Sequence, residues 1–381
     1  MKKCSILTLV LAAMLIVFVS SACAQGSPIG VELVHEIRGE RLDLIHHGHI
    51  VVVDENSNVI FYVGDPEAVV FYRSISKPMQ AMPTIVRDLD IRYNLDPNDI
   101  IIFSASHTGE PFHVEALERM TQAAGLSEDW YIMTDLPSNE AARIAAINAA
   151  VAAGGTRADA FRPFFHNCSG KHTSLLLLQR ELLREQLGHE PTEEQIREYW
   201  KVGSLADLEV IKAMKIFAET ENFEFGVDGC GVPVFAAPMK NIAITFKNFA
   251  RPEKITDEAL RVAATRYMPL IRNDPRMIGG TGVLCSFLNA QPNIVAKSGA
   301  NAAYGFALID EGIGVSIKLT DGSGQMRMVV MEVLRQLHQL GKLNPDVNGD
   351  FFMTDSLTPP LINAANMVVG ERRTVFTLTA P

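Results

Sequence analysis

The segment Tyr72-Arg73-Ser74-Ile75-Ser76-Lys77-Pro78-Met79-Gln80 places a serine three residues before a lysine, with a proline directly after it. Pro78 favours the first turn of a helix, and residues three apart on a helix share a face. Ser74 and Lys77 would then point together from a helix start, where the helix dipole disfavours an ammonium and stabilises an alkoxide. The segment predicts either a nucleophile with its base or a capping serine beside a solvated lysine.

Two further polar segments favour the catalytic interpretation. Ser104-Ala105-Ser106-His107-Thr108-Gly109-Glu110 follows an apolar run, and Lys297-Ser298-Gly299-Ala300 precedes an expected strand. Alone, these would be a capping turn and a polar strand end. In this order, however, Ser-x-x-Lys, a serine-containing turn and Lys-Ser-Gly resemble the motif set of serine β-lactamases and penicillin-binding proteins, whose fold the glutaminases share.

Hydrophobic patterning predicts an α/β (α+β) fold. Strands are expected at residues 31–37, 44–53, 59–63, 303–309, 313–319 and 373–378, and helices at 115–124, 139–153, 172–186, 192–200, 207–217 and 328–340. This order suits a β-lactamase-like antiparallel sheet built from both chain ends, with a helical insertion between them. We expect residues 25–80 and 226–381 to form the part that contains the sheet, and residues 81–225 the mainly helical part.

Composition limits the function classes. The chain has 381 residues, of which 48% are hydrophobic and 20% charged, and its formal net charge is −10. An ordinary globular composition of this length is ample for a large core. With an acidic balance and no basic run, nucleic acid is not an expected partner.

The N-terminus has the pattern of a secretory signal peptide over residues 1–24. Lys2 and Lys3 precede a short apolar run, and Ala22-Cys23-Ala24 fits a cleavage site. Lipidation of Cys23 is the alternative. The run is too short for a membrane span, so we expect an exported, periplasmic or extracellular protein.

Longer matches resemble one enzyme family. Segments 73–81, 105–110, 167–172, 227–233, 279–282, 296–300 and 321–323 are similar to the signatures of the rhizobial-type L-asparaginases, the asparaginase II family. The resemblance implies an amidohydrolase that converts L-asparagine to L-aspartate and ammonia through an acyl-enzyme. It pairs Ser74 with Lys77, and Ser106 with Lys297. Which serine attacks stays open, although the helix-start position favours Ser74.

The resemblance also suggests binding roles. Arg73 and Asp228 are expected to hold the charged α-groups of the substrate or to orient lysines, and a structural ion pair is the alternative for Arg73. His107, Gly229 and Gly299 complete the expected substrate site.

A zinc ion is the expected cofactor. In the resembled family, the residues matching Cys168, Lys171 and Cys230 bind zinc near the active site. Two thiolates with one nitrogen and one water suit tetrahedral zinc, although a lysine must first lose its proton, and His172 is the runner-up ligand. A disulfide between the two cysteines and free buried thiols are the alternatives.

Three other functions compete with the asparaginase. They are a glutaminase, a penicillin-recognising serine hydrolase (β-lactamase or DD-peptidase) and a non-catalytic amino-acid-binding protein. The resemblance further implies a homodimer. The preference for asparagine or glutamine and the geometry of an oligomer are left open by the sequence.

Overall fold

The computed structural model describes residues 29–344 and 360–381. The expected signal peptide, including Cys23, lies outside the described residues. None of the helices in the described part of the chain combines the length and apolar character that crossing a membrane requires.

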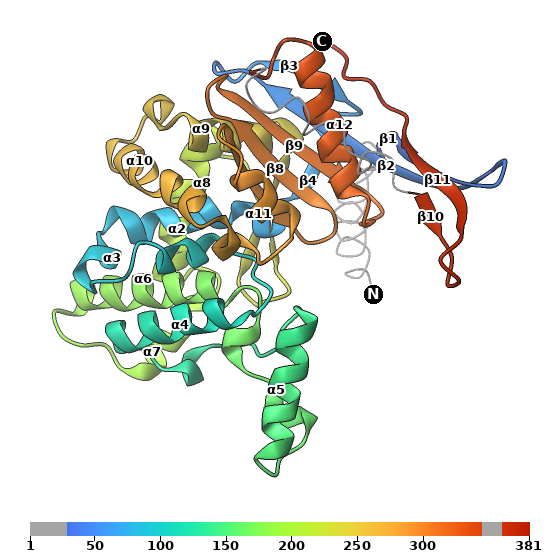
Figure 1. Ribbon diagram of the computed structural model, residues 1–381. Helices are drawn as coiled ribbons and strands as arrows, with labels where there is room; N and C mark the ends of the chain where they lie inside the picture. The colour runs from blue at the N-terminus through green and yellow to red at the C-terminus, as the bar shows by residue number, and fades with distance from the viewer. Residues whose placement is uncertain (1–28, 345–359) are drawn as a thin grey trace, which may run out of the picture.

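Both ends of the chain build the main sheet, as the sequence predicted (Figure 1). The strand order is β10-β11-β1-β2-β9-β8-β7, with β3 paired to β2, and every pairing is antiparallel. The strands are β1 (Val31–Arg38), β2 (Arg41–Val53), β3 (Val59–Val63), β7 (Ile294–Gly299), β8 (Ala303–Leu308), β9 (Ile313–Leu319), β10 (Pro360–Ile362) and β11 (Val368–Thr374).

Helices cover both faces of this sheet, which explains why every residue of β8 is buried. On one face α9 (Met239–Ala250) packs so closely that a Cβ on Gly305 would meet the Phe246 ring. Tyr304 points to the opposite face, toward Cys285 of α11 (Leu284–Asn289) and Arg327 of α12 (Met326–Gln339). A helical layer therefore lies on each side of the central strands.

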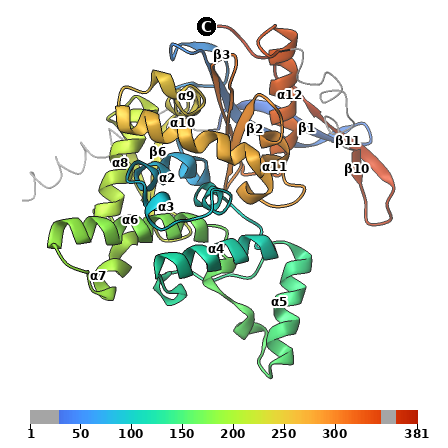
Figure 2. The same cartoon turned by 60° about the vertical axis from the view of Figure 1, so that its left-hand side comes forward.

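The remaining helices form a block that lies on the side of the sheet covered by α9 (Figures 1 and 2). Its centre is α6 (Ser169–Leu187), whose leucines 175–178 are buried as their pattern predicted. By contrast, α5 (Glu140–Ala152) projects outward and has no buried residue. The other helices are α2 (Lys77–Val86), α3 (Leu89–Arg92), α4 (Pro111–Ala124), α7 (Glu193–Arg197), α8 (Leu205–Ala218) and α10 (Glu258–Asn273).

A second, three-stranded sheet connects the two parts. It has the order β4-β6-β5, made of β4 (Val69–Phe71), β6 (Pro233–Pro238) and β5 (Glu224–Val227). Strand β4 runs directly into the Ser-x-x-Lys segment, and the Tyr72 N–H donates to the Phe235 carbonyl at 2.9 Å. The hydrogen bonds of this small sheet therefore fix the position of the backbone directly before Ser74.

The last expected strand, 373–378, is wrong in its position. The strand there is β11, which ends at Thr374. Beyond it, the Phe376 carbonyl accepts from the Gln336 side chain at 3.0 Å, and the Leu378 N–H donates to the same side chain at 2.8 Å. These backbone groups bond to α12 instead of a neighbouring strand, so the alternating apolar residues pack without forming a ladder.

Candidate active site

The Ser-x-x-Lys segment forms a tight turn followed by a helix. Residues Arg73–Ser76 make a 3-10 turn, and Lys77 is the first residue of α2. Gly299 of β7 lies under this turn, because a Cβ there would stand 3.0 Å from the Tyr72 carbonyl oxygen. The absence of a side chain lets the turn pack directly on β7. This contact, rather than close approach of a ligand, is the role that the geometry shows for Gly299.

Two lysines meet at one serine. Lys77 Nζ donates to Ser106 Oγ at 3.1 Å, and Lys297 Nζ donates to the same oxygen at 2.8 Å. Lys77 also donates to the carbonyls of Ala105 at 2.5 Å and Asn167 at 3.2 Å, and Lys297 to that of Ser298 at 2.8 Å. Both amines are fully buried. Segments far apart in the sequence therefore converge on Ser106.

Burial and mutual repulsion shift both lysines toward the neutral amine. Burial lowers the pKa of Lys297 to about 7, and the neighbouring Lys77 adds to the shift. Burial likewise lowers the pKa of Lys77, although the nearby Cys168 and Cys230 oppose the shift. Two buried cations side by side disfavour each other's charged form. Lys297 is therefore an amine able to accept a proton near neutral pH, and the pKa of Lys77 is shifted in the same direction.

The two serines differ in their hydrogen bonds. Ser74 lies on the turn, and the hydrogen bonds described for Lys77 lead to Ser106 rather than to Ser74. Ser106 is further fixed through its backbone, whose N–H donates to the Ile278 carbonyl at 3.0 Å. The structure thus brings Lys77, Ser106 and Lys297 together, with Ser74 three residues before Lys77.

The expected substrate residue His107 is held within the protein. Its Nδ1 accepts from the Gly109 N–H at 3.1 Å, so Nε2 carries the proton and lies 2.7 Å from Ser169 Oγ. The ring stacks on His113 at 4.9 Å between centroids. Burial holds the pKa of His107 well below its usual value. In this arrangement His107 positions the Ser106 loop as a neutral side chain.

Arg73 and Asp228 form an ion pair at the edge of the cluster. Arg73 Nε donates to Asp228 Oδ1 at 2.9 Å, and Asp228 Oδ2 lies 4.0 Å from Lys171 Nζ. There is open space beside Gly229, because the atom nearest to a Cβ added there would be Arg73 Nη2, at 3.9 Å. Arg73 has a left-handed backbone with φ 51°. A non-glycine residue in this region carries strain of a kind that clusters at functional sites.

The thiols of Cys168 and Cys230 are free and buried in the structure, rather than joined in a disulfide. Lys171 Nζ donates to Cys230 Sγ at 3.0 Å. The hydrogen bond from Cys168 lowers the pKa of the Cys230 thiol to about 5, aided by Lys171 and against the effect of burial. Burial alone would lower the pKa of Lys171, but Cys230, Cys168 and Asp228 together raise it. Without a metal, the pair is therefore a thiolate facing an ammonium.

The donor atoms fit a zinc ion in type. Within the described ranges, no three His, Cys, Asp or Glu side chains form a metal-binding group, so a site needs the Lys171 amine beside the two thiols. A thiolate at Cys230 suits zinc. His172 uses Nδ1 for the Tyr199 hydroxyl at 2.7 Å, while its buried Nε2 has no partner, which keeps it as the runner-up ligand.

Comparison with known proteins identifies the family. The family Asparaginase_II, described as L-asparaginase II, matches residues 34–374. The chain belongs to the L-asparaginase II family. A search of curated proteins gives no match. Membership of this family makes the chain an amidohydrolase.

Solved structures give only a loose likeness. A crystal structure of Mglu matches with a TM-score of 0.37 and 14% identity, over 79% of this chain and 69% of that one. A Bacillus glutaminase matches with a TM-score of 0.35 and 16% identity, over 83% and 93%. At these scores neither likeness indicates a substrate.

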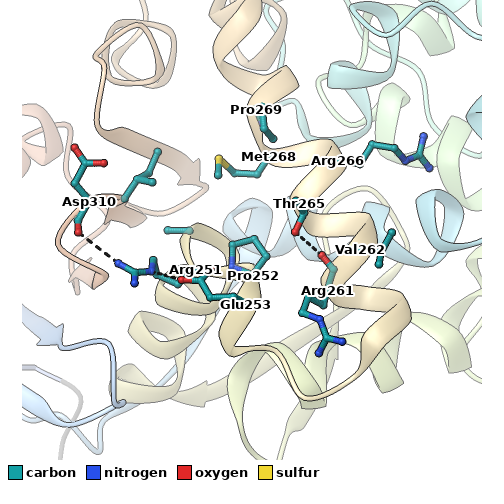
Figure 3. Close-up of a pocket in the computed structure, with 12 residues that line it drawn as sticks. Arg251, Pro252, Glu253, Arg261, Val262, Thr265, Arg266, Met268, Pro269 and Asp310 are labelled. Carbon is teal, nitrogen blue, oxygen red and sulfur yellow. Dashed lines mark hydrogen bonds and ion pairs between the residues drawn. The ribbon is translucent and has the colours of Figure 1, made fainter.

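A cavity of about 950 Å³ (Figure 3) is lined by residues other than Lys77, Ser106 and Lys297. It is lined by α10, the end of α9 and the β8–β9 turn. Its arginines are already engaged: Arg251 pairs with Glu253, and Arg266 with Asp90. None of the expected site residues lines it, so we do not assign it to the reaction.

Sequence reasoning assigned no role to several groups that hold the Lys77–Ser106–Lys297 cluster in place. The carbonyls of Asn167 and Ile278 hold Lys77 and Ser106, and backbone acceptors carry no signature of their own. Glu110 ties the glycine loop of residues 279–282 to the Ser106 loop, accepting from the Thr281 N–H at 2.9 Å. Lys318 was also missed, although a lysine in the mostly apolar 313–319 strand is a signal.

Proposed function

We propose that this protein hydrolyses L-asparagine to L-aspartate and ammonia through an acyl-enzyme. The supporting observation is the convergence of the buried amines of Lys77 and Lys297 on Ser106, beside the turn that carries Ser74. Family membership supports the amidohydrolase class, and asparagine is the substrate that the family description favours.

Ser74 is the proposed nucleophile. Its hydroxyl attacks the side-chain amide carbon while the neutral amine of Lys77 takes its proton. Lys77 then passes the proton to Ser106, whose oxygen it already contacts at 3.1 Å. Ser106 delivers the proton to the departing nitrogen, and the C–N bond breaks to release ammonia. A water molecule attacks the acyl-enzyme, gives its proton to the same relay and restores Ser74 with release of aspartate.

Backbone donors stabilise the oxyanion in this proposal. The Ser106 N–H is excluded because it already donates to the Ile278 carbonyl at 3.0 Å. The N–H of Ser74, on the tight turn before α2, is the candidate donor. Such preorganised N–H groups are worth about 10²–10³ in rate where they have been removed individually.

Arg73 and Asp228 are the proposed partners of the α-groups of the substrate. Each is already paired with the other at 2.9 Å. The substrate's carboxylate would share the Arg73 guanidinium, and its ammonium would share the Asp228 carboxylate. This supports selection of an amino acid over a simple amide.

A second assignment has its own supporting observation. Burial lowers the pKa of Lys297 to about 7, and its amine lies 2.8 Å from Ser106 Oγ. Ser106 would then attack with Lys297 as its base. The two assignments differ in which serine becomes acylated, so the covalent intermediate distinguishes them.

Cys168, Cys230 and Lys171 are the proposed zinc ligands, with His172 as the alternative nitrogen. Zinc at this position would supply a fixed positive charge and a Lewis acid beside the cluster. Asp228 lies next to this proposed zinc site. Lys171 and Arg73 both pair with the Asp228 carboxylate and would hold it in position for the substrate.

A substrate panel tests the proposed function. Ammonia release from L-asparagine, L-glutamine and D-asparagine, together with nitrocefin hydrolysis, separates the competing enzymes. The proposal expects the highest kcat/KM with L-asparagine. Higher activity with L-glutamine would favour the glutaminase, nitrocefin turnover would favour the penicillin-recognising hydrolase, and asparagine binding without ammonia release would favour a binding protein.

Assembly and location are further parts of the proposal. We propose an exported homodimer, based on the family resemblance and the N-terminal sequence pattern. Light scattering of the purified protein tests the dimer. Mass spectrometry of the mature N-terminus from the native host tests cleavage after Ala24 against lipidation at Cys23.

A further inference from the structure

Lys318 is a half-buried cation with no acidic partner in the described structure. Its amine donates to the carbonyls of Asn301 and Leu319, the latter at 2.9 Å. No described Asp or Glu lies within ion-pair distance of it, and the nearby Asp321 is bonded to His46 Nδ1 at 2.5 Å. An unpaired cation in a partly buried position is costly unless an anion completes it.

Sheet register places Lys318 on the catalytic face. Lys318 pairs with Ala303, which pairs with Gly299, and Lys297 lies two residues before Gly299 on the same strand. Cross-strand partners share a face, as do residues two apart. Lys318 therefore projects from the same face as Lys297, two strands away, at roughly 4.8 Å per strand.

A pocket connects Lys318 with Arg73. The pocket has a volume of about 290 Å³, and its polar lining is Arg73, Lys318, Thr320 and Asn301, beside the β4 strand. Burial lowers the pKa of Lys318, and electrostatic repulsion from the charge of Arg73 lowers it further. Arg73 gives only its Nε to Asp228 in the described bonds and is partly exposed.

We infer that Lys318 and Arg73 together form a carboxylate subsite, which takes the α-carboxylate of the amino-acid amide while its side-chain amide lies at the Ser74–Ser106 cluster. The inference rests on the proposed function and assigns Lys318 a substrate-binding role. Two cations that line one pocket match a carboxylate, which accepts several hydrogen bonds at once. The subsite explains why Arg73 is placed by a left-handed turn directly before Ser74.

The test compares three variants of the full-length protein. Lys318→Met removes the cation, Lys318→Arg keeps it, and Lys201→Met is the control, because Lys201 is an exposed lysine paired with Glu198 at 2.6 Å. Three quantities are measured: KM and kcat for L-asparagine, and the Kd of L-aspartate by calorimetry, since the product carries the same α-carboxylate.

In the Lys318→Met variant we expect KM and the aspartate Kd to rise about 10-fold or more, with kcat changed much less, as for loss of a hydrogen bond to a charged group. Lys318→Arg should recover most of the affinity, and Lys201→Met should match the wild type. An unchanged aspartate Kd in Lys318→Met, an equal loss in Lys318→Arg, or no aspartate binding by the wild type would overturn the inference.

The same measurements separate the subsite from the reaction. If the wild type releases no ammonia from asparagine but its aspartate Kd depends on the charge at 318, the proposed function fails and the subsite stands. If asparagine is hydrolysed with no dependence on Lys318, the subsite fails and the proposed function stands.

Discussion

Lys77 and Lys297 donate to the same oxygen, Ser106 Oγ, at 3.1 and 2.8 Å. One lysine begins a helix and the other lies on a strand near the far end of the chain. Because both amines are buried, each disfavours the protonated form of the other. In the proposed mechanism this contact supplies a base and a proton relay at one point.

The pH dependence of the reaction should report this pair. Burial and Lys77 lower the pKa of Lys297 to about 7, so the pair gains a neutral amine as the pH rises through that value. We expect kcat/KM to increase with pH and to level off above about pH 8, one unit beyond the pKa, where deprotonation is about 90% complete. The Lys297→Arg variant, which stays protonated, should lose this inflection. A flat profile between pH 5.5 and 8.5 in the wild type would contradict the assignment.

Removing either member of the Ser-x-x-Lys turn should abolish turnover. We expect Ser74→Ala and Lys77→Met each to lower kcat by roughly 10³ or more, because residues that act as a unit fail together. The double variant should be no worse than either single one. Ammonia release at pH 7.5 measures the effect, and near-normal release by Lys77→Met would show that Lys77 is not the base.

Lys297→Met should make the protein more stable while it removes activity. The pKa of Lys297 is about 7 in the folded protein, lower than its unfolded value of about 10.4. Between these values the unfolded chain binds the extra proton, so this lysine opposes folding, and stability rises with pH. We expect a gain of roughly 1–3 kcal/mol at pH 7.5 that shrinks by pH 9.5. Urea unfolding at both values measures it, and a loss of stability at pH 7.5 would count against a neutral buried amine.

The cysteines provide a matched test of metal binding. Cys230 and Cys285 are both buried and free, but only Cys230 contacts Lys171. Protein purified under reducing conditions should contain about one zinc per chain, the stoichiometry of a single tetrahedral site. We expect Cys230→Ser to lose the metal and Cys285→Ser to retain it, as measured by elemental analysis. Wild-type protein without zinc would leave Cys230 as the thiolate partner of Lys171.

The sequence predicted the sheet and the main helices because burial leaves periodic patterns. The leucine run of α6 and the short turn between β8 and β9 are local signals, and both are confirmed. The sequence analysis did not predict α9, which contains β-branched and aromatic residues, or α10, which contains Pro269. Local signals for α10 are nevertheless present, because its apolar residues recur on one face and the Asp257 side chain caps it by accepting from the Leu260 N–H at 2.8 Å.

The residues of the candidate site were predicted from the sequence, but their contacts were not. Motif spacing identified Lys77, Ser106 and Lys297 as site residues, and the structure brings all three together. Spacing did not show that the bonds described for Lys77 lead to Ser106 and to two carbonyls, because these contacts depend on the path of the backbone. Lys318 was missed because its position near Arg73 depends on how β9 pairs with β8, and the sequence does not show this strand register.

The identity of the acylated serine tests the central claim most directly. The protein is treated with an electrophilic diazoketone analogue of asparagine, digested and mapped by mass spectrometry. The account predicts one label per chain, on Ser74, with Ser106→Ala still labelled slowly at the same position. A label on Ser106 that persists in Ser74→Ala would contradict it and would make Lys297 the base.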